Sequence, residues 1–141
     1  MVDDLSTTFF IRTTLWQQIL ENIWSVLPEE GCGFVAGTGL ESRVVLSVTN
    51  QLHSPVRFEM APLEQLKAML WIEENGMEPV AIYHSHPEGP AVPSPTDLAE
   101  FAYPDAICLI VSPLAAGQIW HLRGFKIIDA QYKELSITIG V

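Results

Sequence analysis

The order of apolar segments along the chain restricts its possible folds more than any other feature of the sequence. Two segments, residues 14–27 and 62–76, carry apolar side chains at helical spacing, as Leu15, Ile19 and Ile23 illustrate. Short apolar or β-branched runs, which are typical of strands, occupy residues 9–11, 32–36, 43–49, 79–86 and 106–111, and residues 118–139 predict two or three further strands. Helices and strands alternate early and strands dominate late, so we expect an α/β fold with one mixed sheet flanked by helices.

Proline, glycine and capping residues predict where the two long helices begin and end. The first helix is expected to start at an N-cap of Thr13 or Thr14 and to stop before Pro28. The second helix has Pro62 in its first turn and Gly76 as its C-cap.

Length and composition indicate one packed domain. The chain has 141 residues, of which 48% are hydrophobic and 17% charged, so it can build a core and is not a wholly disordered chain. No segment resembles an interdomain linker. We therefore expect a single domain over residues 1–141, in which residues 32–36 and 43–49 pair as a hairpin.

The charge balance excludes two classes of partner. Seven Lys and Arg residues stand against 17 Asp and Glu residues, which gives a formal net charge of -10. Because nucleic acids and anionic membranes attract basic surfaces, we expect the protein to bind neither. The longest uncharged stretch, residues 106–121, is shorter than a membrane span and is interrupted by Pro113 and Gly117.

Cysteine usage and the first residues predict the compartment. Cys32 and Cys108 both lie in apolar runs, so buried free thiols are expected, as suits a reducing environment. The acidic pair Asp3 and Asp4 stands where a secretory signal would be basic. We therefore expect a cytoplasmic protein.

Two of the four histidines, His84 and His86, stand at the end of the apolar run at residues 79–86. Residues i and i+2 of a strand point to the same face, so both imidazoles leave the sheet together and could share one metal ion. Imidazole is a good ligand for Zn²⁺. Two surface histidines at a strand end, with no metal, are the competing interpretation.

A second polar group follows a Pro- and Gly-rich loop at residues 87–93. Ser94-Pro95-Thr96-Asp97 is typical of a helix start, with Ser94 as N-cap and Asp97 in the position of a capping box, and a short helix is expected over residues 94–102. The returning loop can also bring Asp97 beside the histidines, where two His and one carboxylate would leave the fourth zinc position open. The two interpretations are compatible, because a capped helix start is a rigid mount for a ligand.

A metal-assisted hydrolysis also needs a carboxylate that is not itself a ligand, to move a proton. Glu29 and Glu30 follow the first predicted helix and are candidates, although two solvated charges at a helix end is the alternative. The remaining histidines, His53 in a loop and His121 in a strand, have no recognisable partners, and we do not expect metal binding at either.

Taken together, these residues resemble the JAMM motif of the JAB1/MPN/Mov34 metalloproteases, in the form found in compact bacterial members. The motif is a Glu, then His-x-His, ten residues and Asp, with a Ser three positions before the Asp; here it reads Glu30-Gly31-Cys32-Gly33, His84-Ser85-His86 and Ser94-Pro95-Thr96-Asp97. In bacterial members the Glu stands two residues before a Cys-Gly pair, which selects Glu30 over Glu29. The resemblance covers residues 28–111.

The resemblance implies the MPN fold, a mixed sheet flanked by helices and related to the cytidine deaminases. It implies Zn²⁺ bound by His84, His86 and Asp97, Glu30 as general acid/base, and Ser94 steadying the attacking water or the developing oxyanion. It further implies hydrolysis of the amide or isopeptide bond after the Gly-Gly tail of a ubiquitin-like protein or a ThiS/MoaD-type sulfur carrier. Such a tail would either add to the strand edge at residues 43–49 or pack against the loop at residues 88–93.

Two other functions are weighed against this one. A non-catalytic MPN scaffold is the main alternative, but such domains usually lack motif residues, and here all are present. A nucleobase deaminase would need His-x-Glu and Pro-Cys-x-x-Cys, neither of which occurs. The sequence leaves open the carrier, the leaving group (lysine, cysteine or peptide) and the oligomeric state.

Overall fold

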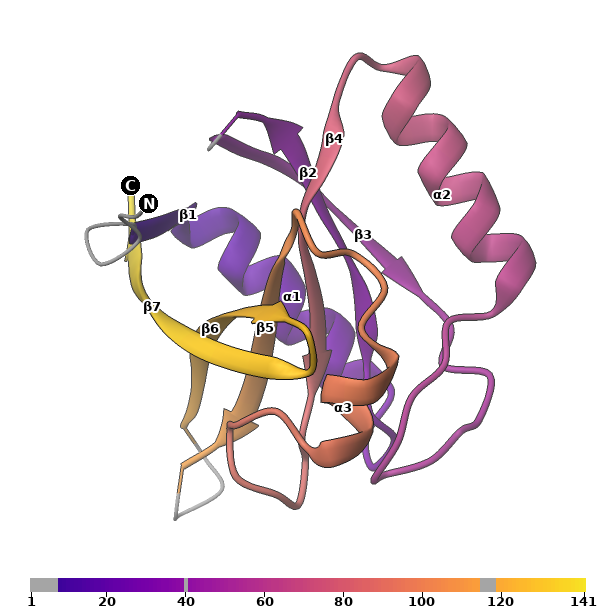
Figure 1. Ribbon diagram of the computed structural model, residues 1–141, viewed down its shortest axis with the longest axis vertical. Coiled ribbons are helices and arrows are strands. Elements are labelled where there is room, and N and C mark those ends of the chain that lie inside the picture. Colours follow the sequence, from indigo (N-terminus) through magenta and orange to yellow (C-terminus); the bar gives the residue numbers. More distant parts are fainter. Residues whose placement is uncertain (1–7, 40, 115–118) are drawn as a thin grey trace.

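The computed structural model describes residues 8–39, 41–114 and 119–141 (Figure 1). Over these residues the order of elements is β1 (Thr8–Arg12), α1 (Thr13–Ser25), β2 (Cys32–Thr38), β3 (Glu41–Val48), α2 (Pro62–Glu74), β4 (Glu78–Ser85), α3 (Pro95–Glu100), β5 (Ile107–Pro113), β6 (Trp120–Ile128) and β7 (Gln131–Gly140). The predicted strands at both ends of the chain are present, while Asp3, Asp4 and residues 115–118 lie outside the described part.

The strands form one seven-stranded mixed sheet in the order β1-β7-β6-β5-β4-β2-β3. The pairs β1–β7 and β4–β5 are parallel and the other neighbouring pairs are antiparallel. The expected hairpin is confirmed, because β2 pairs antiparallel with β3. The expected α/β class, a mixed sheet flanked by helices, is likewise confirmed.

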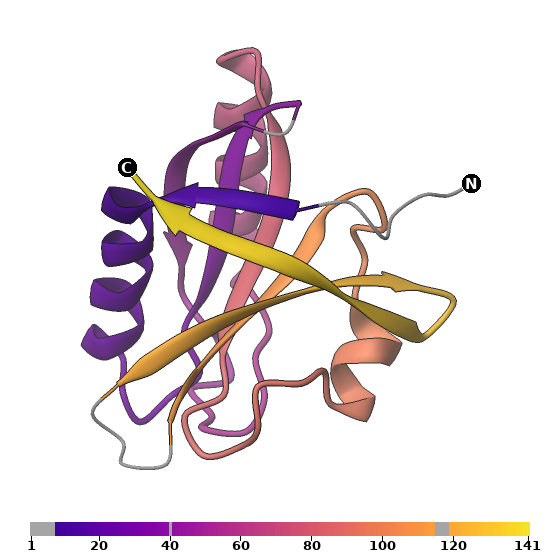
Figure 2. The same ribbon diagram turned by 90° about the vertical axis from the view of Figure 1, so that its left-hand side faces the viewer.

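Helices cover both faces of the sheet, which explains why its central strands are apolar on both sides. Val35 and Tyr83 pack in the same core cluster as α1, whereas their neighbours Phe34 and Ile82 pack with Ile72 of α2. Leu98 of α3 packs on the same side as α2, against Cys108 and Ile110 in a third cluster. Figure 2 shows α1 on one side of the sheet and α3 on the other.

The unit β4–α3–β5 determines where a site can form. Its two strands are parallel, with Ser85 paired to Val111 near their carboxyl ends. In open α/β sheets, ligands bind beyond the carboxyl ends of the strands. The His-Ser-His sequence is located there, and α3 begins beside it.

The predicted helix ends needed several corrections. Neither Thr13 nor Thr14 is the N-cap of α1: Arg12 occupies that position without a side-chain cap, and Thr13 Oγ1 instead donates to the Gly140 carbonyl. The helix ends at Ser25, before the expected residue 27. The difference at Thr13 arises because its hydroxyl is engaged by the end of β7, a contact between distant parts of the chain.

The other helices agree more closely with the predictions. Pro62 lies in the first turn of α2, and Asn75 is its C-cap, with Gly76 directly after it in the left-handed region at φ +70°. Helix α3 is shorter than predicted, but Ser94 is its N-cap and forms the expected capping box with Asp97.

Two further expectations concern burial and length. Both cysteines are free and buried, as predicted. None of the helices in the part of the chain that the structure describes is long and apolar enough to cross a membrane.

Candidate active site

The two histidines of the His-Ser-His sequence meet at the end of β4. Both are buried, and their Nε2 atoms lie 3.0 Å apart. His84 belongs to the strand and His86 follows its last residue, and the two-residue repeat of the strand turns both rings toward the face covered by α2 and α3. The predicted meeting of the rings is therefore present in the structure.

Asp97 comes from the first turn of α3 and joins both rings. Its Oδ2 atom lies 3.2 Å from His84 Nε2 and 3.1 Å from His86 Nε2. The same oxygen accepts a hydrogen bond from the Ser94 backbone N–H, while Ser94 Oγ accepts one from the Asp97 N–H. The helix cap and the contact with the histidines therefore coexist in one side chain, as the sequence suggested.

The hydrogen bonding of His86 leaves a lone pair in this site. Its Nδ1 lies 2.8 Å from the carbonyl oxygen of Pro90, which can only accept, so Nδ1 carries the hydrogen. In the neutral ring, Nε2 then has a lone pair that faces the lone pairs of Asp97 Oδ2. A proton can relieve the repulsion within one pair of atoms, whereas a cation placed between His84, His86 and Asp97 would relieve all of it.

The spacing of the three atoms also suits zinc. In a tetrahedral site with Zn–ligand distances of about 2.0–2.1 Å, neighbouring ligand atoms lie about 3.3 Å apart. The three measured separations are 3.0, 3.1 and 3.2 Å. Two imidazole nitrogens and one carboxylate oxygen are also a ligand set that Zn²⁺ prefers, so these residues fit the ion.

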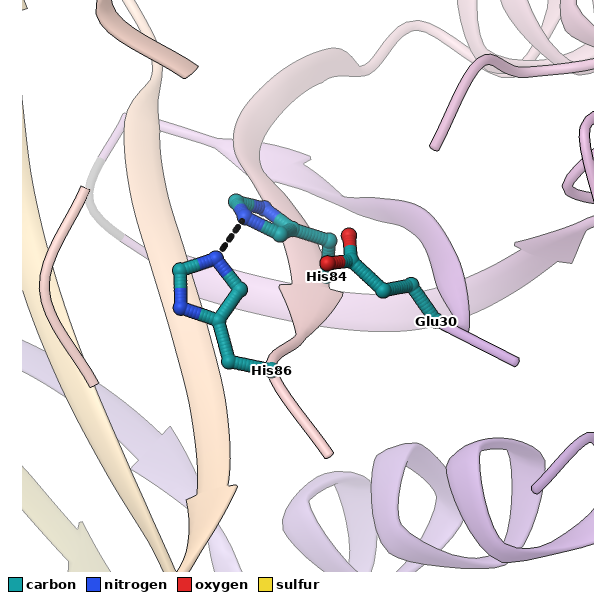
Figure 3. Close-up of side chains that lie close together, drawn as sticks. All are labelled: Glu30, His84 and His86. Carbon is teal, nitrogen blue, oxygen red and sulfur yellow. Dashed lines mark hydrogen bonds between the residues drawn. The ribbon is translucent and has the colours of Figure 1, made fainter. Parts of the chain in front are cut away.

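Glu30 reaches the same place from the segment that leads into β2. One of its carboxylate oxygens and a ring nitrogen of each histidine all lie within 4.8 Å of one another, and all three residues are buried (Figure 3). Asp97 contacts both rings directly and Glu30 lies farther from them. Asp97 is therefore the better third ligand, and Glu30 is placed to exchange a proton with a molecule bound beside the ligands.

Ser85, between the two histidines, fastens the segment that carries Glu30. Its Oγ accepts a hydrogen bond of 2.8 Å from the Gly31 N–H, and its own N–H donates to the Gly31 carbonyl at 3.0 Å. Ser85 points to the opposite face of the strand from the two histidines. The tripeptide His84-Ser85-His86 therefore presents both rings on one face and binds Gly31, the residue after Glu30, through Ser85.

Burial and charge shift the pKa values of the site in different directions. Burial raises the pKa of Glu30 to about 8, although His86 opposes the shift and Asp97 adds to it. Burial also lowers the pKa of His84. For His86 and Asp97 burial acts against the charged forms, but their mutual contacts prevail, so the pKa of His86 is raised and that of Asp97 lowered.

The pKa of Glu30 predicts how the stability of the metal-free protein depends on pH. The unfolded pKa is 4.5 and the folded pKa about 8, so the stabilisation is complete below pH 4.5 and is lost as the pH rises through 8. Relative to Glu30→Gln, the chelator-treated protein should lose on the order of 5 kcal/mol of unfolding free energy between pH 4.5 and 8. Denaturant unfolding at several pH values measures the difference. Parallel curves for the two proteins would mean that Glu30 titrates like an exposed carboxyl.

A cavity of about 280 Å³ opens beside the histidines. His84, Ser94 and Asp97 line it together with aromatic side chains, among them Phe58, whose ring stacks on His84 at 4.6 Å and 24°. A smaller cavity of about 130 Å³ is lined by Glu30 and Glu64. The larger cavity thus reaches His84 and Asp97, and the smaller one reaches Glu30.

The remaining candidates of the sequence lie outside this arrangement. Glu29 is turned to His53, whose Nδ1 lies 3.1 Å from its carboxylate, so His53 has a partner that the sequence did not reveal. His121 lies in β6, as predicted, and its buried Nδ1 has no hydrogen-bond partner among the residues that the structure describes.

Sequence reasoning missed two residues of the site, Phe58 and Asn50. Phe58 stacks on His84, and the Asn50 amide donates to the Glu30 carbonyl. Both come from the connection between β3 and α2, which the sequence marks only as an irregular segment. An aromatic residue or an amide in such a segment carries no pattern that would reveal these contacts.

Comparison with known proteins agrees with this geometry. A family model described as prokaryotic homologs of the JAB domain matches residues 12–123. A desampylase from Pyrococcus furiosus is 42% identical over 121 residues, which cover 84% of this chain and 85% of the relative. A CysO-cysteine peptidase from Mycobacterium tuberculosis is 33% identical, with 79% and 77% covered. A probable TtuB-protein conjugate cleaving protease from Thermus thermophilus is 46% identical over 92 residues, with 64% and 62% covered.

Solved structures show the same fold. The solution structure of a protein from Desulfitobacterium hafniense superposes with a TM-score of 0.82 at 29% identity and covers 94% of this chain and 92% of that one. A JAB1/MPN domain protein from Archaeoglobus fulgidus has a TM-score of 0.58 at 20% identity, with 94% and 98% covered, and shows the fold alone. The resemblance found in the sequence is confirmed: the chain belongs to the family of prokaryotic homologs of the JAB domain.

Proposed function

We propose that this chain is a zinc-dependent peptidase or isopeptidase. Its substrate is the amide bond after the Gly-Gly C-terminus of a ubiquitin-like or ThiS/MoaD-type sulfur-carrier protein. The observation that carries the proposal is the convergence of His84 Nε2, His86 Nε2 and Asp97 Oδ2 within 3.2 Å of one another, with the carboxylate of Glu30 nearby. The relatives support it, since their names describe a desampylase, a conjugate-cleaving protease and a peptidase.

His84, His86 and Asp97 would hold the ion, and the bond from His86 Nδ1 to Pro90 keeps that ring oriented. A bound zinc ion supplies Lewis acidity, which polarises a carbonyl group and makes water easier to deprotonate. Phe58 limits access of solvent to one face of the His84 ring.

Glu30 carries the proton. As water adds to the scissile carbonyl carbon, the Glu30 carboxylate accepts a proton from it, and it returns that proton to the nitrogen as the C–N bond breaks. The products are a carrier that ends in a carboxylate and a free amine. Burial raises the pKa of Glu30 to about 8, which makes its carboxylate a stronger base than an exposed Glu.

Ser94 can act as helix cap and as donor at once. Its Oγ accepts from the Asp97 N–H, which uses one lone pair and leaves the hydroxyl hydrogen available. Ser94 also lines the larger cavity. In the proposed reaction this hydrogen is donated to the developing oxyanion, so the two roles do not compete for the same part of the hydroxyl.

We place the Gly-Gly tail along β3. This strand ends the sheet, so one of its edges has no strand partner among the described residues, and an extended peptide could add there. The alternative, the loop at residues 88–93, is already engaged, because Ala91 is buried and the Pro90 carbonyl contacts His86. Glycine suits the approach because it has no side chain to collide with the walls.

A non-catalytic scaffold would not need this arrangement. It gains nothing from a buried carboxylate beside two histidines, and burying a carboxylate costs stability. We also infer a reducing compartment such as the cytoplasm, which the two buried free thiols support.

The test is cleavage of defined carriers. The zinc-loaded protein is incubated with small Gly-Gly carriers that bear a cysteine, a peptide or an ε-linked lysine at the C-terminus, and the products are identified by mass. Cleavage after the second glycine is expected, and a carrier with Ala-Ala in place of Gly-Gly serves as the control. If the protein binds one zinc ion per chain and leaves every carrier intact, the proposal is wrong.

A further inference from the structure

Asn50 is buried two residues beyond the end of β3, and every hydrogen-bonding group of its side chain has a partner. Its Nδ2 lies within hydrogen-bond distance of three backbone carbonyls, those of Glu30 at 3.1 Å, Arg57 at 3.0 Å and Ser54 at 3.4 Å. Its Oδ1 accepts from the N–H groups of Leu52 and Glu59, both at 3.1 Å. An amide offers two hydrogens and two lone pairs, so no hydrogen-bonding capacity is left unused.

Four of these contacts, those with Leu52, Ser54, Arg57 and Glu59, close the connection between β3 and α2 into a loop. Asn50 also forms a β-bridge with Met60, and the Gln51 N–H donates to the Glu59 carbonyl at 2.9 Å. Asn50 therefore contacts both ends of the loop formed by residues 51–59.

The same loop holds both backbone groups of Glu30. The Glu30 N–H donates to the Ser54 carbonyl at 2.8 Å, and the Glu30 carbonyl accepts from Asn50 Nδ2. Glu30 lies before the first residue of β2, so the sheet ladder does not hold it. Its main chain is instead fastened to a loop that follows it by some twenty residues, Asn50 being 20 positions away.

The loop also carries the ring that covers a histidine. Phe58 stacks on His84, and the two residues that flank Phe58 are both bonded to Asn50, Arg57 through its carbonyl and Glu59 through its N–H. One buried amide thus clamps the backbone on either side of the stacked ring.

We propose that Asn50 is a positioning residue that sets Glu30 and His84 relative to one another. It does so through the Glu30 backbone on one side and through Phe58 on the other. No other residue type offers the same set of contacts: Asp keeps the acceptor but cannot donate to three carbonyls, and Ala leaves all of these groups unpaired in a buried place. The expected change in kcat rests on the proposed function, whereas the expected structural link between Glu30 and Phe58 does not.

The test measures kcat and KM of Asn50→Ala and Asn50→Asp on a cleaved Gly-Gly carrier, together with zinc content. Because a displacement of about 1 Å at a catalytic group costs about 100-fold, we expect kcat to fall about 10–100-fold in both variants. KM and zinc stoichiometry should change little, because the ligands and the β3 edge remain. Leu135→Ala, a truncation in the buried core of β7, is the matched control for lost stability. It should retain its kcat per folded molecule.

Backbone amide exchange gives a readout that needs neither activity nor a variant. In the wild-type protein, the amides of Glu30, Leu52 and Glu59 should show one common protection factor, because one amide side chain links them in a single opening unit. In Asn50→Ala the Glu30 amide should exchange faster, although its own acceptor is Ser54. Leu135→Ala should leave this local pattern intact.

Three outcomes would overturn the positioning role: wild-type kcat in Asn50→Ala, an equal fall of kcat in Leu135→Ala, or unrelated protection factors of the three wild-type amides. If the Asn50 variants do not fold, the protection factors of the wild-type amides still decide. If the wild-type protein cleaves no carrier, the proposed function fails, but the exchange experiment tests the link between Glu30 and the Phe58 loop independently.

Discussion

Glu30→Gln is expected to reduce peptide hydrolysis about 10²–10⁴-fold, the typical contribution of general acid–base assistance. Glutamine has nearly the same shape, but it cannot accept a proton from water and return it to the departing amine. Because Asp97, and not Glu30, directly contacts both histidines, zinc should remain bound. Cleavage of a Gly-Gly carrier followed by mass, and zinc content by elemental analysis, measure the two effects separately.

Glu29→Gln is the matched control. It makes the same change one residue earlier, at a carboxylate that faces His53 on the surface, and should leave hydrolysis unchanged. Equal activity of Glu30→Gln and wild type would remove Glu30 from the mechanism. Loss of zinc together with activity in Glu30→Gln would instead make Glu30 a ligand.

His84→Ala and Asp97→Asn are expected to lose the metal and, with it, all measurable hydrolysis. Each removes one of three converging ligand atoms, and a catalytic zinc site with only two protein ligands holds the ion poorly. Zinc content after dialysis should fall from about one ion per chain to near zero. Asp97→Asn is informative because its amide oxygen can still accept the Ser94 N–H, so the start of α3 is kept.

His53→Ala controls for a general effect of losing a histidine. His53 is exposed and paired with Glu29, and it makes none of the contacts that join His84, His86 and Asp97, so its removal should leave the zinc content at the wild-type level. Full zinc occupancy in His84→Ala would mean that the metal is held by other residues, and the assignment of the three ligands would then be wrong.

Much of the candidate site was predictable because its signals are local. The two-residue spacing of His84 and His86 follows from the pleat of any strand, whatever surrounds it. The capping box joins Ser94 and Asp97, which stand three positions apart, and depends only on the start of a helix. Such patterns can be recognised in the sequence without knowledge of the rest of the fold.

The helix ends show where local rules stop. Thr13 was a good N-cap candidate by residue type, but its hydroxyl donates to Gly140, 127 positions away. A preference worth about 1 kcal/mol, as at an N-cap, is easily overridden by the packing of strands that meet only in the folded chain.

The sequence by itself determined the class of fold, the two converging imidazoles and the capped aspartate, because each depends on spacings of two to four residues. Only the tertiary structure decided that Asp97 Oδ2 reaches both rings, that the Pro90 carbonyl sets the tautomer of His86, and that Asn50 and Phe58 join Glu30 to His84. These contacts depend on the paths of two irregular loops. Those paths are set by the packing of the whole sheet and its helices, and no periodicity in the chain records them.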